Sequence, residues 1–127
     1  MNIHIEEGKQ IELRTEVNET DTSRVYGSGL LDVYSTPAMV ALMERASMEL
    51  VQPYLEEGFG TVGISLDIRH MKAIPIGEEI LCISKFMGSE GNQLTFEVKV
   101  MRGQDTVGEG IHKRYIIDEK RFLSKIK

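Results

Sequence analysis

Thr36, Glu44 and His70 bring together a hydroxyl, a carboxylate and an imidazole, each in or beside an apolar segment. Enzymes use these groups to activate a nucleophile or a water molecule, and a group with a pKa near 7 serves best. Each residue also has an ordinary structural explanation, respectively a helix cap, a boundary carboxylate reaching water and a buried histidine with a local partner. Because all three are expected to face one seam between a helix and a sheet, their combination favours catalysis.

The element that must position Glu44 is a helix expected from Thr36 to about Tyr54. Thr36 is expected to cap this helix, with Pro37 at the first helical position, where no N–H is needed. Glu44 falls on the border of the apolar arc, away from the polar centre of the helix. The arc consists of Met39, Val40, Met43, Ala46, Ser47, Leu50 and Val51. The free N–H groups at the helix start, on Ala38 and Met39, are expected to hold a developing oxyanion.

His70 is expected to lie on a strand. Alternation of apolar and polar residues predicts strands over 10–18, 60–75, 79–87, 93–101 and 106–117, with a connecting loop over 19–35. In the second strand His70 continues the face of Val62, Ile64, Leu66 and Ile68, which should meet the helix. Asp118 could cap a short closing helix.

These elements predict a single α+β domain over residues 1–127, with one long helix on a five-stranded antiparallel sheet. Such a sheet has two open edges and leaves apolar surface uncovered. We therefore expect two copies of the chain to pair.

Composition excludes several classes of function. A net charge of −5 in 127 residues is unlike that of a nucleic-acid-binding protein. The chain starts without the features of a signal peptide and has no apolar run of membrane-spanning length, so no membrane partner is expected. One cysteine, Cys82, suits a reducing cytoplasm. His4, His70 and His112 show no metal-ligand spacing, so no metal is expected.

Three blocks of the sequence resemble the hotdog-fold thioesterases, in particular the fluoroacetyl-CoA thioesterase family. They are STPAMVALMERA, GTVGISLDIRHMKAIPIG and GEGIHKRYIID. The resemblance implies a sheet wrapped around the central helix and pairing of two chains into a continuous sheet. It therefore implies a homodimer with active sites at the subunit interface, and the sequence leaves open whether dimers assemble further into a tetramer. The implied catalytic set is Thr36, Glu44 and His70, and the implied acyl-CoA entrance holds Arg114 and His112.

The expected activity is hydrolysis of an acyl-CoA thioester, with coenzyme A as part of the substrate and no other cofactor. Glu44 and His70 would activate either a water molecule or the Thr36 hydroxyl, and the sequence leaves both routes open. The alternative is a non-catalytic protein that binds acyl-CoA or another hydrophobic ligand. A hotdog dehydratase fits less well, because the His-plus-acid spacing of that branch is missing. The segment before the helix, VYGSGLLDVYS, also lacks the phenylalanine-bearing lid of the fluoroacetyl-specific enzyme.

Overall fold

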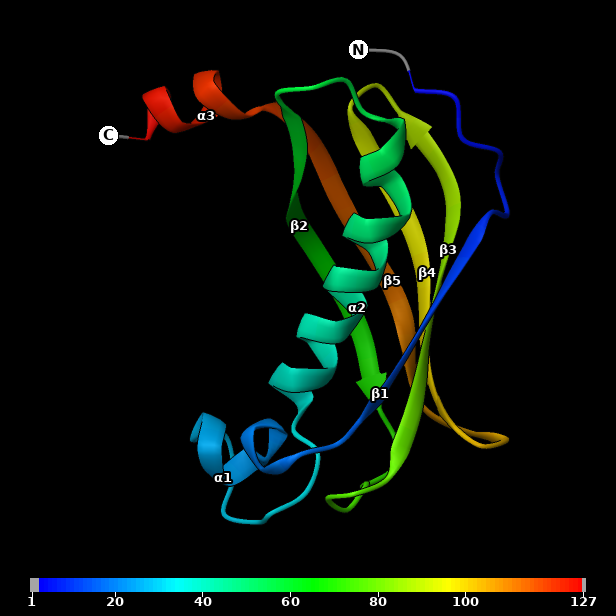
Figure 1. Cartoon of the computed structure of the whole chain (residues 1–127), viewed down its shortest axis with the longest axis vertical. Coiled ribbons are helices and arrows are strands. Elements are labelled where there is room, and N and C mark those ends of the chain that lie inside the picture. Colours follow the sequence, from blue (N-terminus) through cyan, green and yellow to red (C-terminus); the bar gives the residue numbers. More distant parts are fainter. Residues whose placement is uncertain (1–2, 127) are drawn as a thin grey trace.

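The computed structural model describes residues 3–126. One long helix lies in the hollow of a curved sheet, as the sequence predicted (Figure 1). The strands are β1 (Gln10–Glu16), β2 (Phe59–His70), β3 (Glu79–Glu90), β4 (Gln93–Arg102) and β5 (Asp105–Asp118). The α-helices are α1 (Ser23–Tyr26), α2 (Thr36–Val51) and α3 (Glu119–Lys125), and the 3-10 helices are η1 (Glu19–Asp21) and η2 (Gln52–Tyr54).

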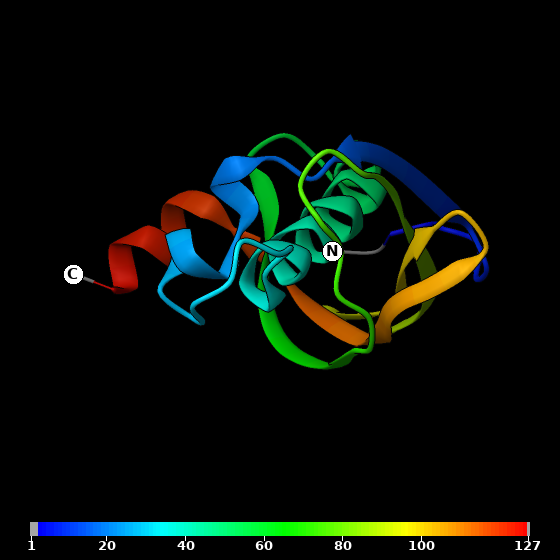
Figure 2. The same ribbon diagram turned by 90° about the horizontal axis from the view of Figure 1, so that it is seen from below.

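The five strands form one antiparallel sheet in the order β1-β3-β4-β5-β2. Seen along the helix from below, the sheet bends around α2 (Figure 2). The strands β1 and β2 are the two edges, so the side of α2 next to β2 is not closed by a further strand. The position of β2 at an edge matters for function, because β2 ends at His70.

The hydrophobic core fills the space between α2 and the central strands. Four inward residues of β4 are fully buried, as their alternation predicted, and β3 contributes a matching row. The β4 row is Leu94, Phe96, Val98 and Val100, and the β3 row is Ile80, Cys82, Ser84 and Phe86. Ser47 of α2 donates to the carbonyl of Met43 and meets the Ser84 hydroxyl at 2.8 Å, so the two small polar side chains satisfy each other where helix and sheet meet.

The start of α2 corrects one detail of the sequence prediction. Ser35 is the N-cap, and its hydroxyl accepts a hydrogen bond from the N–H of Ala38 at 3.1 Å. Thr36 is therefore the first helical residue and Pro37 the second. The extended backbone of Ser35 puts its hydroxyl against the first turn, and the Thr36 side chain is free for another contact.

The predicted apolar face of β2 is wrong at Val62 and Ile64. A Cβ added to Gly63 would point at Glu44, so Gly63 faces α2 and its two neighbours face away. A β-bulge at Ile64 shifts the register between Gly63 and Ser65. The extra residue restores Leu66, Ile68 and His70 to the inner face, because one added residue reverses the alternation.

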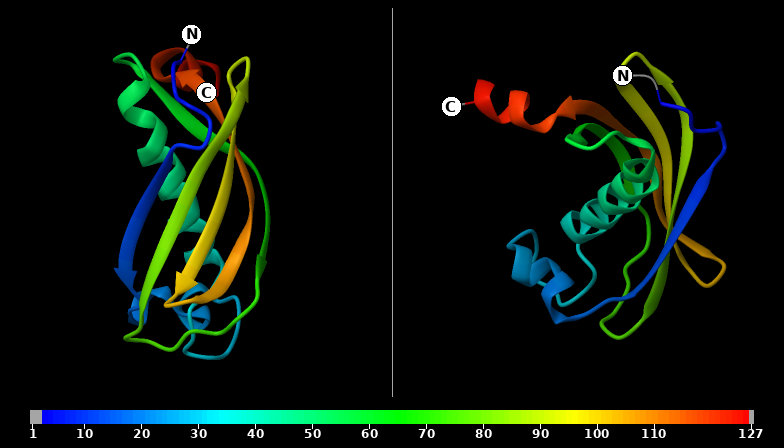
Figure 3. Two further views of the ribbon diagram at one scale, coloured as in Figure 1. Left: turned by 90° about the vertical axis from the view of Figure 1, so that its right-hand side faces the viewer. Right: turned by 45° about the horizontal axis from the view of Figure 1, so that its top comes forward.

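Two further segments lie beside this core. The predicted loop over 19–35 contains η1 and α1. An isolated bridge, Thr22–Tyr34, lies within the loop, and a second, Val33–Pro75, joins it to the segment that follows β2. The closing helix α3 begins at Glu119, and Asp118 caps it as predicted by accepting a hydrogen bond from the N–H of Arg121. Figure 3 shows α3 extending away from the sheet.

Candidate active site

Thr36 and His70 form a direct pair at the N-terminal end of α2. The Thr36 hydroxyl oxygen lies 2.8 Å from Nδ1 of His70, although the two residues are 34 positions apart in the chain. The bulge in β2 makes the contact possible, because it turns His70 toward the helix. Thr36 is exposed, so its hydroxyl is accessible to a substrate. The structure therefore brings together two of the three residues that the sequence selected for catalysis.

The far side of the His70 ring lacks a partner. Nε2 is buried and has no hydrogen-bond partner within residues 3–126. The ring of Tyr34 packs edge-on against the imidazole at a centroid distance of 6.1 Å. Burial lowers the pKa of His70 below its ordinary value of 6.5, and the backbone of Lys72 offsets part of this effect. A neutral imidazole is the form that can accept the Thr36 proton.

A cavity of about 280 Å³ opens beside this pair. Its walls include Thr36 and His70 together with Val33, Tyr34 and Met71, so its lining combines polar and apolar groups. Lys72 stands at the same cavity, but its ammonium pairs with Asp105 at 3.2 Å. The space has the mixed lining of a small-molecule site, with a hydroxyl–imidazole pair in its wall.

The predicted oxyanion donors at the helix start are already engaged. The N–H of Ala38 donates to the Ser35 hydroxyl, and the N–H of Met39 donates to the Ser35 carbonyl at 3.1 Å. Both residues are buried. Because Ser35 rather than Thr36 caps the helix, the cap occupies the donors that the sequence analysis assigned to substrate.

Glu44 belongs to a second group of residues. It lies two helical turns beyond Thr36, about 12 Å along the axis at a rise of 1.5 Å per residue. Its carboxylate lies 3.6 Å from the guanidinium of Arg114, and its side chain is 42% exposed. The prediction that Glu44 borders the apolar arc is confirmed, but within one chain its carboxylate is far from the Thr36–His70 pair.

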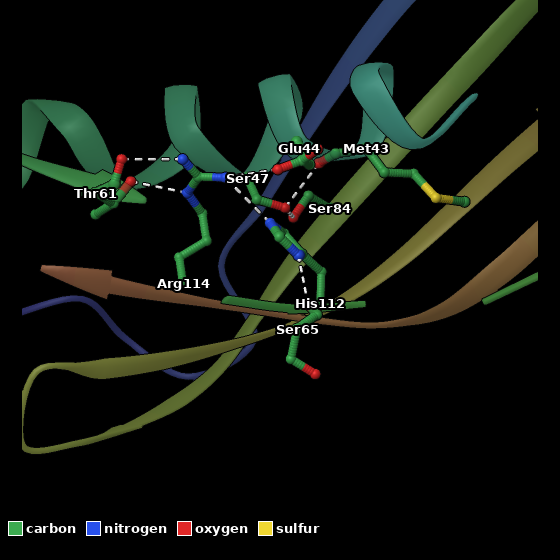
Figure 4. A network of polar contacts seen from close by, with 8 residues as sticks. All are labelled: Met43, Glu44, Ser47, Thr61, Ser65, Ser84, His112 and Arg114. Atoms are coloured by element: carbon green, nitrogen blue, oxygen red, sulfur yellow. Dashed lines mark hydrogen bonds and ion pairs between the residues drawn. The ribbon is translucent and has the colours of Figure 1, made fainter. Parts of the chain in front are cut away.

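Arg114 and His112, which are predicted to lie at the acyl-CoA entrance, are buried side chains of β5. The Arg114 side chain is 8% exposed, and His112 is 1% exposed. Arg114 donates to the Thr61 hydroxyl at 2.8 Å and to the Thr61 carbonyl at 3.1 Å (Figure 4). His112 and Arg114 are two residues apart on β5, so both side chains lie on the face of the sheet that meets α2. There they form a cluster with Glu44.

Three residues of β2 complete this second group, although their residue types alone did not point to a site. Thr61 and Ser65 supply acceptors, and Gly63 supplies space, because a Cβ there would stand 2.5 Å from the Glu44 carboxylate. The glycine pattern of β2 hinted at a close approach. Only the pairing of β2 with β5, which places Gly63 opposite Arg114, shows which side chains lie close to this glycine.

No helix within residues 3–126 has the length and apolar character needed to cross a membrane.

Comparison with known proteins gives a consistent result. Residues 17–120 match the family described as fluoroacetyl-CoA-specific thioesterase. A fluoroacetyl-CoA thioesterase from Streptantibioticus cattleyicolor is 33% identical over 96 residues, which cover 76% of this chain and 69% of that protein.

Solved structures agree with this relationship. A structure of a fluoroacetyl-CoA thioesterase superposes with a TM-score of 0.92 at 29% identity, covering 97% of this chain and 96% of that one. The structure of a mutant fluoroacetyl-CoA-specific thioesterase in complex with fluoroacetate and CoA has a TM-score of 0.88 at 29% identity and covers 93% of this chain and 99% of that one. A thioesterase superfamily member from Thermus thermophilus has a TM-score of 0.89 at 27% identity, covering 96% and 90%. These likenesses identify the sheet and its central helix as the hotdog fold.

Proposed function

The chain belongs to the family of fluoroacetyl-CoA-specific thioesterases, and on that premise we propose that it hydrolyses an acyl-CoA thioester to a free acid and coenzyme A. The observation that carries this proposal is the contact of 2.8 Å between the Thr36 hydroxyl and Nδ1 of His70, in the wall of a cavity of mixed polar and apolar lining. A hydroxyl bonded to a neutral imidazole is an activated nucleophile.

In the proposed reaction, the oxygen of Thr36 attacks the thioester carbonyl carbon and His70 takes the hydroxyl proton. The carbon–sulfur bond then breaks, and His70 returns the proton to the leaving thiolate of coenzyme A. Water, activated by the same imidazole, releases the acid from Thr36. The cap occupies the N–H groups of Ala38 and Met39, and Pro37 has none, so the N–H of Thr36 is the first-turn donor available to the oxyanion.

We further propose that the site is completed by a second copy of the chain. Glu44 and Thr36 lie on the same side of α2, at equal distances in sequence from Val40 and next to the edge strand β2. A two-fold axis near Val40 would therefore bring Glu44 of the partner subunit beside Thr36 and His70. That carboxylate would accept a hydrogen bond from the unpartnered Nε2 of His70 and hold its ring in the reactive tautomer.

The test is the release of coenzyme A from short, medium, aromatic and fluorinated acyl-CoAs. The wild-type chain should hydrolyse at least one of these classes, and Glu44→Gln should lower kcat/KM about 100-fold, because a catalytic imidazole that is no longer held in position loses rate. Glu49→Gln is the matched control, because this carboxylate lies on the same helix and pairs with Arg45 on its outer side. A control that lost the same activity would contradict the role given to Glu44.

The route through Thr36 has its own test. A slowly hydrolysed acyl-CoA should leave an acyl group on Thr36, detected as added mass on the peptide that contains it. Acid release without any acyl-enzyme at single-turnover times would favour direct attack by water. Tight binding of acyl-CoA with no hydrolysis across the whole panel would instead identify a ligand-binding relative.

A further inference from the structure

The ring of His112 is held in one protonation state by its two neighbours. Nδ1 lies 2.9 Å from the backbone carbonyl of Ser65, which can only accept, so Nδ1 carries the proton. Nε2 lies 3.2 Å from Nη1 of Arg114, which can only donate, so Nε2 must present its lone pair. A neutral ring protonated at Nδ1 satisfies both contacts. A second proton would direct an N–H at the guanidinium.

The guanidinium of Arg114 is consequently held on both edges. Thr61 accepts from Nε and Nη2 on one edge, and His112 accepts from Nη1 on the other. The same Nη1 approaches Glu44 at 3.6 Å. Because these contacts fix the guanidinium plane, the position of the cation that faces Glu44 depends on the acceptor at His112.

We propose that His112 is a positioning residue, whose Nε2 holds the Arg114 guanidinium against Glu44 and so fixes the catalytic carboxylate. The inference rests on the proposed function for the role of Glu44, and it assigns His112 a task other than contact with coenzyme A. His112 itself touches neither the Thr36–His70 pair nor the cavity beside it. Its buried ring acts through Arg114, with both nitrogens already engaged.

This arrangement makes activity depend on a neutral His112. The groups that face the ring are Arg114 from β5, Glu44 from α2, the Ser65 carbonyl from β2 and the uncharged ring of Phe96 from β4, at a centroid distance of 6.2 Å. Burial lowers the pKa of His112 and Arg114 lowers it further, while Ser65 and Glu44 act in the opposite direction. Protonation at acid pH would remove the acceptor and release the guanidinium.

The first measurement compares kcat and KM of His112→Leu and His112→Gln with wild type. The leucine removes the acceptor, and kcat should fall about 10- to 100-fold because a misplaced catalytic group loses rate, while KM stays nearly constant. Glutamine presents a carbonyl oxygen near the place of Nε2 and should recover most of kcat. Unchanged kcat in the leucine variant, or no recovery in the glutamine variant, would overturn the proposal.

The pH profile provides a test that needs only the glutamine variant, in case the leucine variant does not fold. Two histidines must be neutral in the wild type for full activity, so log kcat/KM should fall on the acid side with a slope that exceeds 1 and approaches about 2. In His112→Gln the slope should become about 1, whereas the control His4→Gln should keep the wild-type slope. A slope that the His112 substitution leaves unchanged would overturn the role.

A structural measurement separates this inference from the proposed function. Nitrogen NMR should show the wild-type His112 ring protonated at Nδ1, and a slowly exchanging Arg114 Nη1–H that His112→Leu loses and His112→Gln retains. If no acyl-CoA is hydrolysed but these signals behave so, the thioesterase assignment fails and the positioning of Arg114 stands. Retention of the Arg114 signal in the leucine variant would overturn the positioning even in an active enzyme.

Discussion

The two ends of the candidate site are built in opposite ways. At the N-terminal end of α2, Thr36 is exposed, the buried Nε2 of His70 has no partner within residues 3–126, and a cavity lies alongside. Two turns further on, the buried groups of Arg114 and His112 are bonded to Thr61, to Ser65 and to each other. One end has a reactive pair with room beside it, and the other is a closed polar cluster.

The difference indicates how chemistry and stability are divided in this small domain. Buried polar groups are stable only when paired, so the inner cluster can be satisfied at all times and contribute rigidity. A reactive pair must leave a position for substrate, which keeps it partly unsatisfied in the isolated chain. Substitutions at the N-terminal end should therefore lower activity alone, whereas substitutions in the inner cluster should lower stability as well.

Removing His70 should have the largest effect, confined to activity. His70→Ala deletes the base that takes the Thr36 proton, so kcat/KM should fall by about 10²- to 10⁴-fold. The midpoint of thermal unfolding should change little, because the ring makes one side-chain hydrogen bond and leaves Nε2 unpaired. Assays of coenzyme A release beside thermal melts test both parts. A variant that keeps wild-type activity would remove His70 from the mechanism.

Removing Arg114 should lower the stability of the inner cluster. Arg114→Met strands the acceptors at His112 and Thr61 inside the protein, which should lower the free energy of unfolding by about 2–3 kcal/mol. Urea unfolding measures this loss. The matched control is Arg45→Met, whose exposed pair with Glu49 should contribute no more than about 1 kcal/mol. Equal losses in the two variants would show that the inner cluster contributes no special stability.

The neighbouring residues Ser35 and Thr36 allow the same comparison of stability with activity within two adjacent positions. Ser35→Ala removes the N-cap and should lower the free energy of unfolding by about 1 kcal/mol. Thr36→Val should leave that free energy nearly unchanged while abolishing acyl-enzyme formation, because its hydroxyl contacts His70 instead of capping the helix. Urea unfolding and single-turnover assays of both variants provide the test. A stability loss in the valine variant larger than in the alanine variant would contradict the assigned cap.

The smallest expected effect is a dependence of stability on pH. Burial lowers the pKa of both His70 and His112 from 6.5, so the unfolded chain binds protons more tightly than the native one. The free energy of unfolding should therefore be highest above pH 6.5 and decline as the pH falls from 6.5 through the lowered native values. Urea titrations at several pH values should show a weaker decline in His112→Gln. An equal decline would mean that His112 titrates alike in both states.

The amphipathic pattern and turn residues of the sequence largely determined the fold. Alternation of apolar residues was enough to place the sheet and its inward rows in β4, and the arc around Met43 was enough to place the long helix. The prediction was wrong at Val62 and Ile64, where a single extra residue reverses the alternation. No local pattern distinguishes a bulged strand from a regular one.

The sequence by itself also determined which side chains could do chemistry, because a hydroxyl, a carboxylate and an imidazole on inward positions are visible as residue types. Only the tertiary structure decided how they combine. Strand register and helical rise placed His70 beside Thr36, and the same geometry put Glu44 with Arg114 and His112 two turns away. Contacts between residues far apart in the chain depend on how the helix and strands pack together. The sequence of each element alone does not show that packing.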